Sequence, residues 1–192
     1  MHVMKKNWKT ILIFILIPLV VGIVAGLFTR GGMEQFQMLN KPPLAPPAWL
    51  FPIVWTILYT LMGISSYLIY SAECMKGKWK EILKDGKQRN CKSEQKRKAL
   101  ILYGYQLIVN FLWPVFFFNF GWYGFSYLWL IILWILVAGM IWEFDKISQT
   151  AALLNIPYLV WLSIAGYLNL SIWLLNWQNY KKMFIDGMFC TK

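Results

Sequence analysis

The sequence predicts an all-α integral membrane protein, a bundle of five transmembrane helices. Hydrophobic residues make up 59% of the 192-residue chain, compared with roughly 45–50% in soluble domains. Charged residues are only 14% of the chain and lie between five long apolar segments. Each segment has about the 20 residues that a helix needs to cross the hydrocarbon core. Open strands would leave backbone amides unpaired in lipid, so helices are the expected spanning elements.

The first apolar segment follows a basic N-terminus but is too long for the apolar region of a signal peptide, roughly 7–15 residues. We therefore count it as the first helix of a single domain that covers residues 1–192. The helices are expected at about 9–28, 49–72, 99–119, 121–142 and 151–175.

Turn residues mark the boundaries of these segments. Residues 29–32 (Thr-Arg-Gly-Gly) are expected to end the first helix, and the proline-rich run at 41–47 cannot continue any helix. The link at 119–121 is so short that the third and fourth helices must be antiparallel neighbours. Residues 73–98 form a long basic insertion for which the sequence indicates no function.

The charge distribution predicts the orientation. The side with the N-terminus, the 73–98 insertion and the 143–150 turn carries 14 Lys and Arg residues, and the other side carries 5. The positive-inside rule then places the N-terminus in the cytoplasm, for a protein of the cytoplasmic membrane. Lys96, Arg97 and Lys98 could also hold anionic lipid head groups, but topology signalling is the preferred explanation of these charges. Membrane lipid is an expected partner, and nucleic acid is not.

The expected spans contain no ionisable residue in their interior, which argues against pumps and ion-coupled transporters. The one histidine is His2, and the three cysteines lie in polar segments, so no metal site is expected. A conventional Ser-His-Asp catalytic centre is likewise unsupported.

Aromatic and neutral polar residues recur at helical spacing within the spans. Such spacing places each set on one face of its helix. If the faces converge, they form an aromatic-walled pocket for a flat apolar ligand with polar edges, but ordinary helix packing explains the same spacing. The sets are Trp55 with Tyr59; Gln106, Asn110 and Trp113; Trp122 with Trp129; and Trp161, Ala165 and Leu168. Gly22 and Gly26 form a small-xxx-small pair that permits close helix approach.

Several ordered motifs carry a family resemblance. Residues 39–43 (LNKPP) precede Pro46-Pro47-x-Trp49, and residues 54–63 contain VWxxLYxxMG. Residues 105–117 contain YQLxxNxxWPxFF, a Gly-Trp pair stands at 121–122, and residues 152–169 contain AxLxxPYxxW followed by AxxLN. Over about residues 15–176 this pattern resembles the TspO/MBR family.

The resemblance implies a five-helix bundle, usually a homodimer, whose pocket opens toward the proline-rich loop and binds porphyrins and haem-related tetrapyrroles. The resemblance also implies that the protein requires no cofactor other than such a ligand. The positions that match the family's pocket are Gly26, Pro46, Pro47, Trp55, Asn110, Trp113, Trp122, Phe125, Trp129, Trp161, Ala165 and Leu168.

Three departures from the family pattern are present. Leu44 stands where the family usually has tryptophan, and Phe125 and Trp129 are bulkier than is typical. Residues 170–173 lack the tyrosine and arginine of the animal cholesterol motif, so cholesterol import is not predicted.

Three functions remain open from the sequence. The first is tetrapyrrole binding for transport, sequestration or regulation. The second is light-dependent porphyrin degradation, which the resemblance would assign to Trp55 and Trp161 as the only candidate catalytic residues. The third is a dimeric scaffold whose pocket holds lipid.

Overall fold

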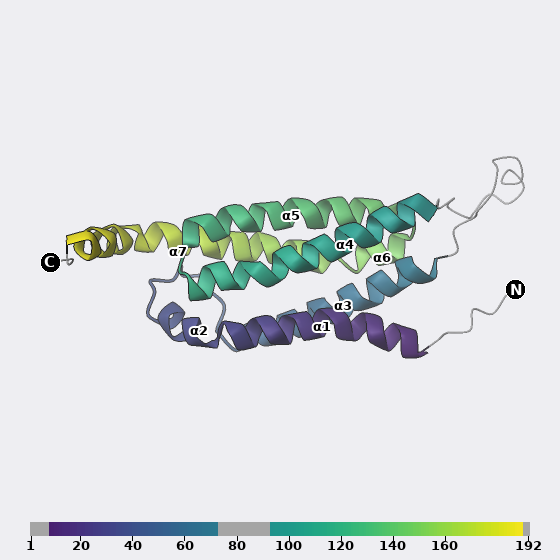
Figure 1. The fold of residues 1–192 in the computed structure, drawn as a ribbon, viewed down its shortest axis with the longest axis horizontal. Helices are drawn as coiled ribbons and strands as arrows, with labels where there is room; N and C mark the ends of the chain where they lie inside the picture. Colours follow the sequence, from purple (N-terminus) through teal and green to yellow (C-terminus); the bar gives the residue numbers. More distant parts are fainter. Residues whose placement is uncertain (1–7, 73–92, 190–192) are drawn as a thin grey trace, which may run out of the picture.

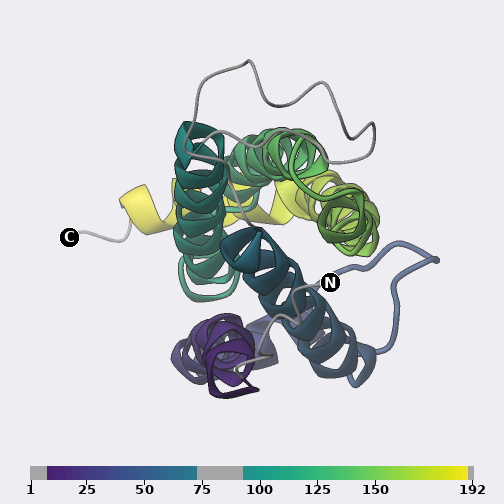
Figure 2. The same cartoon turned by 90° about the vertical axis from the view of Figure 1, so that its right-hand side faces the viewer.

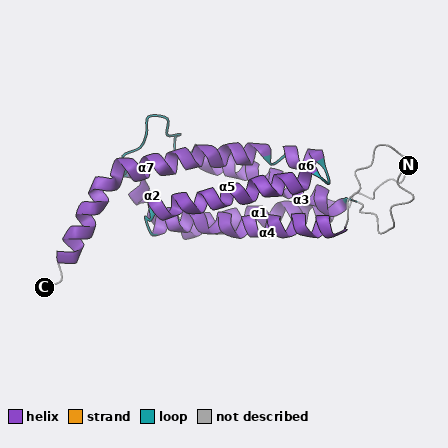
Figure 3. Cartoon of the chain, turned by 90° about the horizontal axis from the view of Figure 1, so that it is seen from above, coloured by secondary structure: helices purple, strands orange, loops and turns teal. Residues whose placement is uncertain are grey.

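The computed structural model describes residues 8–72 and 93–189, and within them the side chains of residues 8–32, 36–72 and 93–177. Every regular element in this part of the chain is a helix, and the long helices lie side by side along one axis (Figures 1 and 3). Five of the described helical segments are long and apolar enough to cross a membrane. The predicted all-α, five-span architecture is therefore confirmed. Residues 73–92 of the basic insertion lie outside the described residues.

The described part of the chain contains five long helices and three shorter helical elements. In chain order they are α1 (Trp8–Phe28), α2 (Arg30–Gln37), α3 (Leu50–Ser71), α4 (Ser93–Pro114), the π-helical segment η2 (Val115–Asn119), α5 (Tyr123–Asp145), α6 (Gln149–Leu153) and α7 (Ile156–Phe189).

The five long helices surround a common interior. Helix α1 packs on α3, α4 on α5, and α5 on α7, and α1 also touches α4. Viewed along the bundle, the order is α1, α3, α7, α5, α4 (Figure 2). The turn between η2 and α5 depends on Gly121, whose φ of 63° lies in the left-handed region that favours glycine. The predicted antiparallel pairing of the third and fourth spans is confirmed.

Several predicted boundaries differ from the structure. The connection expected at 29–48 contains helix α2, whose Phe36 ring packs on Phe117 and Phe118 at centroid distances of 5.8 and 5.4 Å. Helix α4 begins at Ser93 instead of 99, α5 runs to Asp145 instead of 142, and α7 continues to Phe189 instead of 175. Hydropathy marks where lipid contact ends, whereas a helix can continue into water.

Prolines explain two interruptions. The last expected span is divided into α6 and α7, because Pro157 lacks the N–H that would continue a helix from 151. Pro114 ends α4, and the π-helical segment η2 follows it directly. A proline removes one backbone hydrogen bond, and the neighbouring turn rearranges to accommodate the loss.

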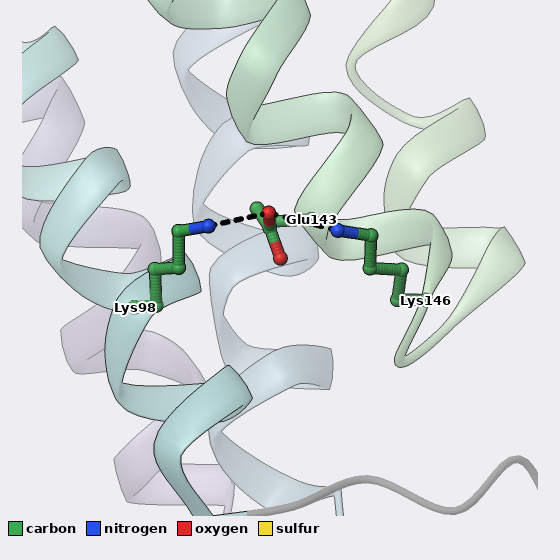
Figure 4. Close-up of polar contacts among 3 residues, drawn as sticks. All are labelled: Lys98, Glu143 and Lys146. Atoms are coloured by element: carbon green, nitrogen blue, oxygen red, sulfur yellow. Dashed lines mark hydrogen bonds and ion pairs between the residues drawn. The ribbon is translucent and has the colours of Figure 1, made fainter.

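The two ends of the bundle differ in chemistry. The end where α3 stops and α4 starts is here called the basic end. There the buried Glu143 accepts hydrogen bonds from Lys98 and Lys146, whose Nζ atoms each lie 2.9 Å from its Oε1 (Figure 4). These contacts join α4 to the end of α5. At the opposite end, here called the α2 end, α1 stops, α3 begins, and α2 lies beside them (Figure 1).

Candidate functional site

A cavity of about 600 Å³ lies between α1, α3 and α4 at the α2 end. Its size falls within the roughly 300–1,000 Å³ of typical small-molecule sites. The described lining residues come from α1, α2, the end of the proline-rich loop, α3, α4 and η2, and most of them are apolar. Such a wall favours a ligand that is itself largely apolar.

Glycines on α1 and α3 show where these two helices pack closely and where they do not. A Cβ atom added at Gly22 would overlap the Tyr59 ring, and one added at Gly63 would reach the α1 backbone at Ile15. Helices α1 and α3 are thus in close contact over this stretch. At Gly26, one turn farther along α1, an added Cβ would meet no atom within 4 Å. The two helices therefore separate beyond Gly22, and Gly26 lines the space between them.

A chain of hydrogen bonds forms the polar wall of the cavity. Tyr59 donates to Asn110 Oδ1 at 2.8 Å, and Asn110 Nδ2 donates to the Tyr158 hydroxyl at 2.6 Å. Tyr158 in turn donates to Gln106 Oε1 at 3.2 Å. Only Tyr59 and Asn110 of these four residues line the cavity. The chain positions one phenol and one amide at the cavity surface, where they can orient the polar edge of a ligand.

Two tryptophans contribute flat walls. The Trp55 ring stacks on Tyr59 with centroids 5.2 Å apart and planes at 29°, and Trp113 stacks on Phe117 at 5.2 Å and 24°. With the Asn169 amide oriented to match its donors, its oxygen accepts from Trp113 Nε1 at 3.3 Å. Each indole is held by a neighbour, so the walls are preformed for a planar ligand.

A second, much smaller cavity lies behind this one. Its volume is about 30 Å³, roughly the space of one water molecule. The two cavities share four lining residues, all aromatic: Phe36, Phe51, Trp113 and Phe118. These four rings, the aromatic partition, separate the space next to α1 from the space next to α7.

The predicted pocket residues distribute around this partition. Gly26, Trp55 and Asn110 line the large cavity; Pro46, Ala165 and Leu168 line the small one; and Trp113 lines both. Trp161 is buried and lines neither cavity; its ring makes an edge-to-face contact with Phe51 at a centroid distance of 5.8 Å. Pro47 is exposed and also outside both cavities.

The remaining three predicted residues belong to a different cluster. Trp122, Phe125 and Trp129 gather around Phe116, with centroids 6.5, 4.9 and 5.0 Å from its ring. Trp122 is 55% exposed and Phe125 44% exposed. Trp129 donates its indole N–H to Val109 O at 2.8 Å. The structure does not bring these side chains to the lining of the large cavity.

Some residues at the site were not singled out by spacing. Arg30, Phe36 and Phe51 line the large cavity. Asn176 holds the proline-rich loop, since its Nδ2 donates to Asn40 O at 3.0 Å and its Oδ1 accepts from Asn40 N at 3.1 Å. An asparagine near the end of the last span is a weak signal in sequence, because nothing indicates which backbone it will bind.

The chain has clear relatives. A family model described as the TspO/MBR family matches residues 14–174. The chain is 33% identical to the translocator protein of Bos taurus over 171 residues, which cover 88% of this chain and 92% of the relative. It is 32% identical to the tryptophan-rich protein TspO of Chlorobaculum tepidum, covering 90% and 99%. It is 31% identical to protein CrtK of Rhodobacter capsulatus, covering 81% and 85%.

Proposed function

The chain belongs to the TspO/MBR family of integral membrane proteins, and we propose that it binds a tetrapyrrole in the large cavity, for transport, sequestration or regulation. The observation that carries this proposal is the cavity of about 600 Å³ with Trp55 and Trp113 in its walls and the Tyr59–Asn110 pair at its surface. Stacking on aromatic rings and a few directed hydrogen bonds suit a flat ring system with polar edges.

The cavity supports binding more directly than catalysis. Among the described residues, no group of three or more His, Cys, Asp or Glu side chains is placed to hold a metal ion. Among the described lining residues, the polar groups other than Arg30 are neutral hydroxyl, phenol and amide groups. The site therefore offers shape and hydrogen bonds, and we infer that its role is to hold a ligand.

The test is a titration of the detergent-purified protein with protoporphyrin IX, followed by quenching of tryptophan fluorescence. Trp55→Ala removes a cavity wall, and Trp142→Ala is the matched control, because Trp142 is 69% exposed and lies near the basic end. We expect saturable binding for the parent protein and for Trp142→Ala, and at least tenfold weaker binding for Trp55→Ala. Equal affinity in all three proteins would contradict the proposal.

A lipid-binding scaffold gives a different result in the same experiment. Quenching that never saturates and does not differ between the variants would show that the pigment only partitions into the micelle. Native mass spectrometry of the purified protein would then be expected to show bound phospholipid and no pigment.

Light-dependent porphyrin degradation is the second candidate, and Trp55 favours it. Trp55 lines the cavity, whereas Trp161 does not and contacts it only through the ring of Phe51, which is a lining residue. If the protein degrades its ligand, the bound Soret band should disappear under illumination faster than that of free pigment. Trp55→Phe should then slow the loss more than Trp161→Phe does, and an unchanged spectrum in the light and in the dark would leave binding as the function.

We further propose that the basic end faces the cytoplasm, as the charge distribution predicts, so that the cavity lies nearer the opposite membrane surface. Cysteine labelling at exposed positions of the two ends in intact cells would test this orientation.

A further inference from the structure

The large cavity carries one charged group among its described lining residues. Arg30, the first residue of α2, lines the cavity and is exposed at the α2 end. The other polar lining residues are Thr29, Thr56, Tyr59 and Asn110, which are neutral. The charge is thus confined to the end of the cavity where water can reach it.

Three of the neutral groups already donate their hydroxyl protons within the protein. Thr29 donates to Ala25 O at 2.9 Å and Thr56 to Pro52 O at 2.8 Å, so both hydroxyl protons return to their own helices. Tyr59 donates to Asn110. A carboxylate placed deep in the cavity would therefore lose its hydration without gaining a cation, which is strongly unfavourable. An anionic ligand has to keep its charge at the α2 end.

Among the residues whose side chains the structure describes, Lys41 is the second cation near this end, and it is placed differently. It lines the small cavity, and its Nζ lies 4.7 Å from the centroid of Phe36, where the ring quadrupole attracts it. Phe36 belongs to the aromatic partition, so Lys41 and Arg30 serve different cavities. Arg30 is the cation that a ligand in the large cavity meets.

We propose that Arg30 binds a carboxylate of the ligand, so that the cavity selects flat apolar ring systems that carry an acidic side chain. The ring would lie between Trp55 and the α1 wall, and the carboxylate would lie at the α2 end. A guanidinium group suits this role because its planar array of N–H donors matches both oxygens of a carboxylate. This inference rests on the proposed function and adds the charge and the orientation of the ligand.

The test compares two ligands that share one ring system. Protoporphyrin IX carries two carboxylates, and its dimethyl ester carries none. Both would be titrated into the parent protein, Arg30→Gln and Arg97→Gln. Arg97 is an exposed arginine of α4 near the basic end, so its replacement makes the same change of charge far from the cavity.

In the parent protein we expect the acid to bind about tenfold more tightly than the ester, the effect of one charge-assisted hydrogen bond. Arg30→Gln should weaken the acid to the level of the ester and leave the ester unchanged, while Arg97→Gln should change neither. The preference for the acid should also decrease at high salt, because Arg30 is exposed.

The inference is overturned if Arg30→Gln weakens the acid and the ester equally, or changes neither while the porphyrin still binds. If the parent protein binds neither porphyrin, the proposed function fails. The same comparison with oleate and methyl oleate then decides whether Arg30 recognises the carboxylate of a fatty acid, and equal binding of those two ligands would reject that as well.

Discussion

Adding one methyl group to α1 should have opposite effects at Gly22 and Gly26, although the two residues lie one helical turn apart. Alanine is more favourable than glycine in a helix by roughly 0.5–1 kcal/mol, and this gain is common to both variants. At Gly22 the new Cβ would overlap the Tyr59 ring. That ring cannot easily move, because it stacks on Trp55 and is hydrogen-bonded to Asn110.

Overpacking of this kind costs about 1–3 kcal/mol. Gly22→Ala should therefore lower the free energy of unfolding, whereas Gly26→Ala, with no atom within 4 Å of the new Cβ, should raise it slightly. The common helical gain cancels in the comparison, so the two variants should differ by about 1–3 kcal/mol. For a chain of this size, each 1 kcal/mol corresponds to roughly 2–4 °C in Tm.

The assay is thermal unfolding in detergent, followed by circular dichroism at a helical wavelength, with the porphyrin titration alongside. Gly26→Phe supplies the functional counterpart, since a ring at this position would occupy the cavity. We expect it to abolish saturable binding while the protein stays folded. Equal Tm values for the two alanine variants would refute the close packing of α1 on α3 at Gly22, and unchanged binding by Gly26→Phe would show that the ligand lies elsewhere.

Three further predictions concern the hydrogen bonds of the bundle. Tyr59→Phe leaves the Asn110 carbonyl without its donor and should reduce the stability by about 1 kcal/mol, as measured by thermal unfolding; an unchanged Tm would mean that the bond is not formed in the membrane protein. Asn176→Ala removes both hydrogen bonds to the Asn40 backbone. It should accelerate ligand dissociation, measured by stopped flow, with little change in Tm. An unaltered dissociation rate would argue that the proline-rich loop does not control ligand release. Glu143→Gln removes the carboxylate that two lysines share. It should lower the Tm by the equivalent of about 1 kcal/mol without changing the affinity for porphyrin. Weaker binding would reveal coupling between the basic end and the cavity.

The five spans were predictable because lipid imposes a strict requirement on length and polarity. The interior of each apolar segment lacks charge, and the structure places a long helix on each of them. Helix α2 was not predictable in this way. It has eight residues and is mainly polar, and it lies beside η2 through Phe36, a tertiary contact that no local pattern in the sequence reveals.

Spacing predicted shared helix faces better than it predicted shared cavities. Trp55 and Tyr59 stack on each other, and Trp161, Ala165 and Leu168 are all buried on one face of α7. Periodicity cannot show what a face meets, because that depends on the rotation and separation of neighbouring helices. Trp161 is thus in contact with Phe51 but is not itself part of a cavity wall.

The contacts that join the helices differ between the two ends of the bundle, and the cavity lies at the α2 end. Near the basic end, Ser65 donates to Ala151 O at 2.8 Å and Asn155 bonds to both of them, which joins α3 to α6. The Glu143 contacts join α4 to α5 close by. At the α2 end, Phe28 of α1 makes the contacts with α4 and η2. Its ring packs edge-to-face with Phe111, and its carbonyl oxygen accepts a hydrogen bond from Asn119. The separation of α1 from α3 beyond Gly22 thus leaves the polar contacts of the basic end intact. At Gly26 the protein contributes only a hydrogen atom to the cavity wall, so the rings of a ligand can occupy the space beside it.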